Sequence, residues 1–376
     1  MKKGIFIVYS NFTGENNTGI QKKIDLQIAA LNENGLQCEK HIVDIKDNDV
    51  ATKLFSRLPF TNVAPTWKWN QIYENIDFIY FRRPHFINGY LIKILKKIKK
   101  KNPFCKIVLE IPTYPYDKEI VYRSKCSFLN FPFLIKDRFW RKRLKKAVDC
   151  VTFVNDGYTE WCGLKVITIS NGIRVDDYPL KKQSNYRTNV INLIAVAFFK
   201  EWHGYERLLF GLADYLQKEK NGKYKVNIHF VGDGSELDRY KTIVDDNNLQ
   251  KYVFFHGLLT GDQLDEMYDC CDFGLCSFGA YKKNIFLSKE LKSREYLSRG
   301  LPIISGVHLD VFDKGFKYYL EFENNDSVVD FDKIINFYEL LKEKGLSSIN
   351  IETREFAMNE LNYKKCFESV IDFFNS

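Results

Sequence analysis

Short apolar runs alternate with amphipathic stretches along most of this chain. Runs at residues 5–9, 77–81, 106–111 and 150–154 have the length of buried strands, and apolar residues at helical spacing follow the first of them. The segment 90–101 is amphipathic and lies between two of these runs. Strands that alternate with helices in this way predict a parallel sheet covered by helices on both faces.

The alternation stops after Gly172 and resumes near residue 190. Residues 175–187 are polar and lack a clear period, which predicts a linker. A second series of apolar runs follows, at residues 190–199, 226–231, 252–255, 273–276 and 301–305. Because 376 residues is more than twice a typical domain of ~150 residues, we expect two α/β domains.

The composition is that of an ordinary globular protein, with 45% hydrophobic and 28% charged residues, which excludes a disordered chain. No apolar run approaches the ~20 residues of a membrane-spanning helix, and the start of the chain does not read as a signal peptide. The nine cysteines include no Cys-x-x-Cys pair, so we expect reduced thiols in a cytoplasmic protein. Metal-binding signatures are also missing, and we expect neither a metal nor a cofactor.

The positive charge of +8 is concentrated in two segments of the first half, residues 91–101 and 136–146. The second segment places basic residues beside aromatic ones, a combination that suits adsorption to an anionic membrane. Its candidate membrane contacts are Trp140, Arg141, Lys142 and Arg143. The apolar stripe of 91–101 has an equally good interpretation as the buried side of an outer helix. We therefore expect a cytoplasmic protein that binds the inner-membrane surface peripherally.

Candidate chemistry is densest between residues 286 and 305. A helix there carries Lys292 and Glu295 at i, i+3, ends at Gly300, and is followed at once by an apolar strand. The amide groups at such a helix start attract anions, Lys292 adds a cation for a phosphate, and Glu295 can accept hydrogen bonds from a sugar diol. The alternative is an exposed ion pair on an ordinary helix.

The segment 295–304, EYLSRGLPII, resembles the nucleotide-sugar signature of retaining GT-B glycosyltransferases of family four. Four further segments resemble landmarks of that family in the same order: 170–173, 230–234, 253–257 and 267–275. The resemblance implies two Rossmann-like domains facing across a cleft. Residues 1–172 would bind the acceptor and 173–355 the nucleotide sugar, while a helix at 356–376 would pack back on the first domain.

The resemblance also implies roles for individual residues, with two departures from the family pattern. The first glutamate of a frequent glutamate pair is replaced by Leu287, whereas the second, which contacts the nucleotide ribose, is Glu295. The usual diphosphate-binding arginine and lysine are replaced by Phe198 and His203, so Lys200 is the preferred cation and His203 the second. A capping or packing role for His203 is equally compatible with the sequence.

The residues expected to hold the donor are thus Glu295, Lys200, His203, Lys292, Gly19, Gly232, Ser288 and Leu291. Loops after two strands of the first half would face the acceptor, through Arg83, His85, Tyr114 and Tyr116. Lys200, Lys292, His85 and Glu110 are the candidates for contact with the reacting groups. The prolines and tyrosines of these loops have a simpler alternative as residues that shape and cover a rigid turn.

These observations predict a metal-independent enzyme that transfers a sugar from a nucleotide-diphosphate sugar, with UDP favoured, to a saccharide or polyprenyl-diphosphate-linked acceptor. Retention of configuration and a role in capsule, exopolysaccharide or O-antigen synthesis are implied by the resemblance. A GT-B-fold sugar-nucleotide epimerase is the main alternative. A basic nucleic-acid-binding protein is the third, but no nucleic-acid-binding motif occurs, so we expect no nucleic-acid partner.

Overall fold

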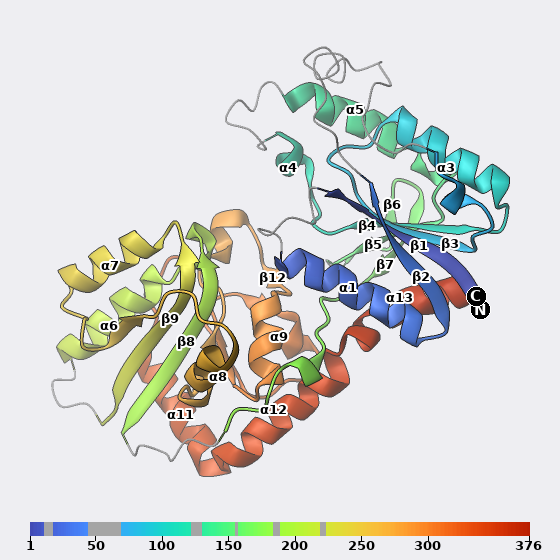
Figure 1. The fold of residues 1–376 in the computed structure, drawn as a ribbon. Helices are drawn as coiled ribbons and strands as arrows, with labels where there is room; N and C mark the ends of the chain where they lie inside the picture. The colour runs from blue at the N-terminus through green and yellow to red at the C-terminus, as the bar shows by residue number, and fades with distance from the viewer. Residues whose placement is uncertain (11–17, 44–68, 122–129, 155–156, 183–188, 219–222) are drawn as a thin grey trace. The chain divides into compact units, whose positions relative to one another are not determined.

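The computed structural model describes residues 1–10, 18–43, 69–121, 130–154, 157–182, 189–218 and 223–376. Contacts within the chain divide it into two compact units (Figure 1). Unit 1 comprises Met1–Gly172 and Tyr363–Ser376, and unit 2 comprises Ile173–Asn362.

Unit 1 is built on a seven-stranded sheet with the order β2-β1-β3-β4-β5-β7-β6. The strands are parallel except for the short β6, which pairs antiparallel with β7. Their bounds are β1 Lys2–Tyr9, β2 Leu36–Val43, β3 Phe78–Arg82, β4 Lys106–Ile111, β5 Cys150–Phe153, β6 Glu160–Trp161 and β7 Leu164–Thr168.

Helices cover both faces of this sheet, as the alternating pattern predicted (Figure 1). One apolar core contains residues of α3 and α5, and the other contains residues of α1 and α13. Leu91, Leu95 and Ile98 of α3 are buried, so the apolar stripe of this basic helix faces its own sheet. The helices are α1 Thr18–Glu33, α3 Gly89–Lys101, α4 Asp117–Val121, α5 Phe131–Arg141 and α13 Tyr363–Asn375, with 3-10 turns at η3 Gln71–Tyr73 and η5 Leu144–Lys146.

Unit 2 contains a parallel six-stranded sheet with the order β10-β9-β8-β11-β13-β15 and a two-stranded β12-β14 ribbon. The longest pairing joins β8 to β9 over their full length, from Val190↔Lys225 to Phe199↔Gly234. The bounds are β8 Val190–Phe199, β9 Lys225–Gly234, β10 Val253–Phe255, β11 Phe273–Leu275, β12 Leu287–Ser288, β13 Ile303–Ser305, β14 His308–Leu309 and β15 Tyr319–Glu321.

The helices of unit 2 bury their apolar faces in one continuous core around this sheet. They are α6 Glu206–Lys218, α7 Leu237–Asp246, α8 Gly261–Asp269, α9 Leu291–Ser298, α10 Asp310–Asp313, α11 Phe331–Lys344 and α12 Leu346–Glu360, with 3-10 turns at η6 Val175–Asp177, η7 Glu201–His203 and η8 Ala280–Lys283.

The chain passes from one unit to the other after Gly172 and again after Asn362, and the structure near both points differs from what the sequence predicted. Residues 175–182 of the expected linker pack on unit 2, where Val175 is buried and the Lys181 amide donates to the Arg299 carbonyl at 2.9 Å. The expected helix at 356–376 is instead two helices, because α12 ends at Glu360 within unit 2 and α13 begins at Tyr363 within unit 1. Residues 183–188 lie outside the described ranges.

The described part of the chain carries no helix that is both long enough and apolar enough to cross a membrane. The cysteines within it are free thiols, in agreement with the absence of a Cys-x-x-Cys pattern.

A pair of histidines joins β9 to the residue that follows the edge strand β10 in unit 2. His229 Nδ1 lies 3.0 Å from His256 Nε2, and His229 Nε2 lies 3.4 Å from the Asn192 side-chain oxygen. Because that oxygen can only accept, His229 carries its proton on Nε2 and accepts through Nδ1. Burial, followed by the charge of His256, lowers the pKa of His229 to about 4.

The pH dependence of the free energy of unfolding should reveal the lowered pKa of His229. A proton binds the unfolded chain more readily than folded His229, so the stability is fully present above the ordinary histidine pKa of ~6.5 and falls as the pH decreases toward about 4. We expect His229→Gln to flatten this decline in urea unfolding measured across that range. His308→Gln is the control: burial lowers the pKa of His308, but Asp313 and Glu321 outweigh this and raise it above its usual value. The stabilisation by His308 is therefore complete below pH ~6.5, and the slope from there toward about pH 4 should stay as in the wild type. An unchanged slope in His229→Gln would contradict the assignment.

Candidate active site

A cavity of about 490 Å³ lies in unit 2, where β8 and β11 end. Ligands of open parallel sheets bind at this edge, because loops and helix starts meet there. Five residues predicted to hold a donor belong to its lining, together with residues that the sequence did not single out. The lining consists of Val196, Ala197, Phe198, Lys200, Trp202, His203, Ser277, Ala280, Ile285, Ser288, Glu290, Leu291 and Lys292.

Glycines allow the backbone segments around the cavity to lie in direct contact. Gly232 has φ +128°, and a Cβ atom there would lie 2.0 Å from the Ala197 carbonyl oxygen. Gly204 has φ +64°, and its Cβ would lie 2.3 Å from the Gly279 amide nitrogen. Any larger residue would clash with backbone at both positions and would also adopt a strained φ. Gly232, which we expected beside a ligand, therefore has a packing role that accounts for it.

Lys292 is held in place by a buried tyrosine. Its Nζ donates to Tyr205 Oη at 3.0 Å, and Tyr205 Oη donates in turn to the Leu275 carbonyl at 3.1 Å. Burial, followed by the charge of Glu290, raises the pKa of Tyr205 well above its usual value, so the hydroxyl keeps its proton. The ammonium group of Lys292 is consequently fixed at the cavity wall rather than extended into solvent.

Glu290 connects this lysine to the loop after β11. One carboxylate oxygen accepts from the Ser277 amide at 3.1 Å, and the other accepts from the Ser277 hydroxyl at 2.8 Å. The second oxygen also lies 3.5 Å from Lys292 Nζ. Sequence reasoning missed Glu290, and the only signal was an acidic residue two positions before Lys292.

His203 caps the start of the turn η7. Its Nδ1 accepts from the Lys200 amide at 3.1 Å, and its ring stacks on Tyr205 with centroids 5.8 Å apart. Burial, followed by the charges of Lys292 and Lys283, lowers the pKa of His203 to about 2. The imidazole is therefore neutral, and the expectation that it could serve as a second cation is corrected in favour of the capping alternative.

Lys200 is the cation that this segment brings to the cavity. Its Nζ lies 4.5 Å from the centre of the Phe198 ring, and Phe198 is 61% exposed. Phe198 thus supports the lysine two positions later through a cation–π contact. A similar contact places Lys283 Nζ over the Trp202 ring.

Three of the predicted donor residues lie apart from this lining: Gly232, described above, Glu295 and Gly19. Glu295 is one turn beyond Lys292 on α9, half-buried, and accepts from Tyr268 Oη at 3.3 Å. Gly19 lies in the first turn of α1 in unit 1. Of the remaining donor candidates, Ser288 ends β12 and Leu291 begins α9, which places both at the cavity.

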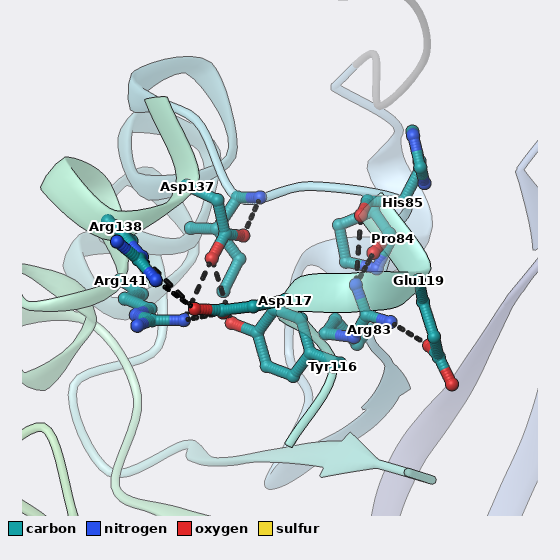
Figure 2. Close-up of polar contacts among 10 residues, drawn as sticks. Arg83, Pro84, His85, Tyr116, Asp117, Glu119, Asp137, Arg138 and Arg141 are labelled. Carbon is teal, nitrogen blue, oxygen red and sulfur yellow. Dashed lines mark hydrogen bonds and ion pairs between the residues drawn. The ribbon is translucent and has the colours of Figure 1, made fainter. Parts of the chain in front are cut away.

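The loops predicted to face the acceptor are fixed by hydrogen bonds and ion pairs with other residues of unit 1 (Figure 2). Tyr116 is buried, and its Oη donates to Asp137 at 2.9 Å. The Arg83 guanidinium lies 3.9 Å from the centre of the Tyr116 ring and donates to the carbonyls of Pro84 and His85 and to Glu119 (Figure 2). Tyr116 therefore shapes its loop, as the alternative interpretation held for the tyrosines, and Arg83 has a similar internal role. His85 and Tyr114 are half-buried and less enclosed.

Glu110 is inaccessible to a substrate in unit 1, because its side chain is fully buried. Its carboxylate lies 3.0 Å from Lys23 Nζ and 3.4 Å from the Arg82 guanidinium. Burial raises the pKa of Glu110, but the charges of Lys23 and Arg82 outweigh this and hold the pKa below its usual value. The structure thus gives Glu110 the role of a buried counter-ion, not the contact with reacting groups that we expected.

Most of the residues that we predicted to contact a membrane are partly buried or paired within unit 1. Arg141 points into unit 1, where it donates to Asp117 at 2.8 Å (Figure 2). Trp140 is half-buried against the core, and Arg143 lies over the Phe139 ring at 3.6 Å. Of the four, Lys142 is exposed and the other three are half-buried.

The described residues contain no group of three or more His, Cys, Asp or Glu side chains placed to hold a metal ion. What the cavity offers instead is a pair of lysines, the Glu290 carboxylate that Ser277 and Lys292 engage, and the start of α9. Such a set can bind a compact anion, because the cations and the helix amides attract the same negative charge.

Comparison with known proteins identifies the class of fold. No protein-family model matches the chain, and no curated protein matches its sequence. A glycosyltransferase from Rickettsia africae is similar over 100% of this chain and 98% of its own, with a TM-score of 0.60 and 11% identity. Anabaena HepE in complex with UDP and glucose is similar over 100% of both chains, with a TM-score of 0.58 and 13% identity. Sucrose-phosphate synthase from Thermosynechococcus elongatus is similar over 100% of this chain and 98% of its own, with a TM-score of 0.59 and 12% identity. The chain has the GT-B fold of these glycosyltransferases.

Removing the Glu290 carboxylate should weaken the cavity wall. In Glu290→Ala, the amide and hydroxyl of Ser277 lose their acceptors, and we expect the free energy of unfolding to fall by about 1–3 kcal/mol. Glu290→Gln keeps an acceptor oxygen and should lose less. Urea denaturation of both variants measures the difference, and equal stabilities would show that the Ser277 contacts are not what Glu290 contributes.

Proposed function

We propose that this protein is a glycosyltransferase that takes a sugar from a UDP-sugar donor bound in unit 2. The observation that carries the proposal is the meeting of Lys200 and Lys292 at one cavity, at the edge of the sheet where β8 and β11 end. A nucleotide diphosphate supplies the compact negative charge that this pair attracts. Further support comes from the fold, which is shared with HepE in complex with UDP and glucose.

The chemistry of the site follows from where charge develops. Cleavage of the donor's glycosidic bond increases the negative charge on the departing diphosphate, and cations fixed before the reaction stabilise that charge most effectively. Lys292 is fixed by Tyr205 and Glu290, and Lys200 by its position over Phe198. These lysines would carry the charge without a metal.

We propose that transfer proceeds with retention by a front-face route. Glu290 is a carboxylate of the described lining, but both of its oxygens are engaged by Ser277, and one also faces Lys292. A double displacement needs an available carboxylate nucleophile. In the front-face route, the leaving diphosphate accepts the proton of the acceptor hydroxyl while that oxygen bonds to the anomeric carbon on the same face.

The acceptor that we propose is a saccharide or a polyprenyl-diphosphate-linked saccharide of capsule, exopolysaccharide or O-antigen synthesis. His85 and Tyr114 of unit 1 remain the candidates for contact with it. The protein would act in the cytoplasm, peripherally at the inner membrane, where such lipid-linked acceptors are found.

Neutralising either lysine should slow transfer severely. We expect Lys200→Met and Lys292→Met each to lower turnover by about 10²-fold or more, because each removes a fixed stabiliser of the leaving group. UDP release from a panel of UDP-sugars with saccharide acceptors measures this effect. Lys251→Met, at an exposed position of unit 2, is the matched control and should be unaffected. Near-normal turnover in both cavity variants would contradict the proposal that the diphosphate binds at this site.

The ribose assignment can be tested by combining a variant with altered ligands. If Glu295 accepts from the ribose hydroxyls, the wild type should bind UDP more tightly than 2′-deoxy-UDP or 3′-deoxy-UDP. Glu295→Ala should bind all three equally. Isothermal calorimetry measures the difference, and discrimination that persists in the variant would show that another residue contacts the ribose.

The identity of the product separates this proposal from the epimerase alternative. A transferase forms UDP and a new glycoside, whose anomeric configuration NMR spectroscopy can compare with that of the donor. Conversion of the UDP-sugar without an acceptor would indicate an epimerase, and an inverted product would contradict the front-face route.

A further inference from the structure

Helix α5 of unit 1 exposes apolar residues and buries charged ones. Phe131, Ile135 and Phe139 are 51%, 48% and 43% exposed. Lys136 and Asp137, which lie between them in sequence, are 1% and 0% exposed. A helix at the surface of a globular protein normally has the opposite arrangement, because apolar burial stabilises the fold and charge burial opposes it.

Polar contacts fix the rotation of this helix (Figure 2). Asp137 accepts from the Ile87 amide at 2.7 Å and from Tyr116 Oη at 2.9 Å. Arg141, one turn later, donates to Asp117 at 2.8 Å and lies 3.5 Å from Asp137. Because buried polar groups keep these partners, the residues at i, i+4 and i+8 on the opposite side must face outward.

Basic residues surround the outward apolar stripe. Lys142 is exposed on the same side of the helix, and Arg143 covers the Phe139 ring at 3.6 Å. Arg138 is exposed as well, but its guanidinium donates to Asp117 at 2.6 and 3.0 Å (Figure 2). Lys145 and Lys146 follow at once in η5 and are exposed. The α5 face, defined here as Phe131, Ile135, Arg138, Phe139 and Lys142, therefore combines an apolar centre with a cationic margin.

We propose that the α5 face docks on the surface of an anionic lipid bilayer. Its three apolar side chains would enter the boundary between head groups and acyl chains, while Lys142, Lys145 and Lys146 pair with lipid phosphates. The excess of cations favours an anionic surface as the occupant. A stripe of three side chains is also small beside the ~800 Å² that each partner buries in a stable protein interface. Docking itself does not depend on the proposed transferase activity, whereas delivery of a lipid-linked acceptor does.

Sedimentation of the full-length protein with vesicles tests the α5 face. The wild type should bind vesicles of phosphatidylglycerol and phosphatidylcholine, and bind pure phosphatidylcholine weakly. The triple variant Phe131→Ser, Ile135→Ser, Phe139→Ser should lower the partition coefficient by roughly 100-fold, because each side chain no longer leaves water on docking. Lys142→Glu, Lys145→Glu, Lys146→Glu should abolish the preference for phosphatidylglycerol and its sensitivity to salt.

A matched control removes exposed apolar side chains elsewhere. Phe104→Ser, Phe312→Ser, Leu340→Ser changes residues that are 94%, 54% and 50% exposed, and this variant should bind like the wild type. Equal losses in the two apolar triples, or no binding of anionic vesicles by the wild type, would overturn the proposal. A wild-type dimer that the α5 triple converts to a monomer in analytical ultracentrifugation would also overturn it, in favour of an interface between copies.

UDP binding by the same variants keeps the two proposals separate. Calorimetry with UDP should give wild-type affinity for both apolar triples, which also shows that they are folded. A wild type that binds anionic vesicles but no UDP would count against the transferase and leave the docking surface intact. The reverse result would count against the docking surface alone.

Discussion

The donor half of this protein depends on direct contact between backbone segments at the carboxyl edge of its sheet. Without side chains at Gly204 and Gly232, the turn after β8 can lie against Gly279 and the end of β9 against Ala197. This contact brings Lys200 and Lys292 to one cavity, although they are far apart in sequence. Tyr205 follows Gly204 directly, so the same turn also places the hydroxyl that holds Lys292.

Buried carboxylates have a different role in each unit. In unit 1, Glu110 forms ion pairs with Lys23 and Arg82, and Asp137 accepts from Tyr116 and Arg141. The contacts of Asp137 fix the rotation of α5 and thereby turn its apolar stripe outward. In unit 2, Glu290 is similarly engaged, but it leaves the Lys292 ammonium at a cavity wall. Charge that is balanced inside unit 1 supports structure, whereas charge that remains at the cavity of unit 2 is available to a ligand.

Much of the fold could be predicted from the sequence, because apolar runs and helical spacing are local signals. The predicted apolar runs became strands β1, β3, β4, β5, β8, β9, β10, β11 and β13, and the change of unit after Gly172 is also of this kind. Strands β2 and β15 were not predicted, and the sequence left open which way the apolar stripe of α3 faces. The break between α12 and α13 was missed, since two consecutive helices of similar composition have no strong stop signal between them. At the candidate site, cationic residues were found from their motif, but Glu290 was not, because its partner Ser277 is distant in sequence.

The sequence by itself determined two α/β units, a lysine-bearing helix start at α9 and a basic segment in the first half. These depend on residue type and on spacing along one element. Only the tertiary structure decided that His203 is a neutral cap, that Glu110, Arg83 and Tyr116 serve the interior, and that α5 presents Phe131, Ile135 and Phe139 to solvent. The reason is physical: a charged or aromatic side chain faces inward or outward according to the partners that distant strands bring to it, and the spacing of one helix does not contain them.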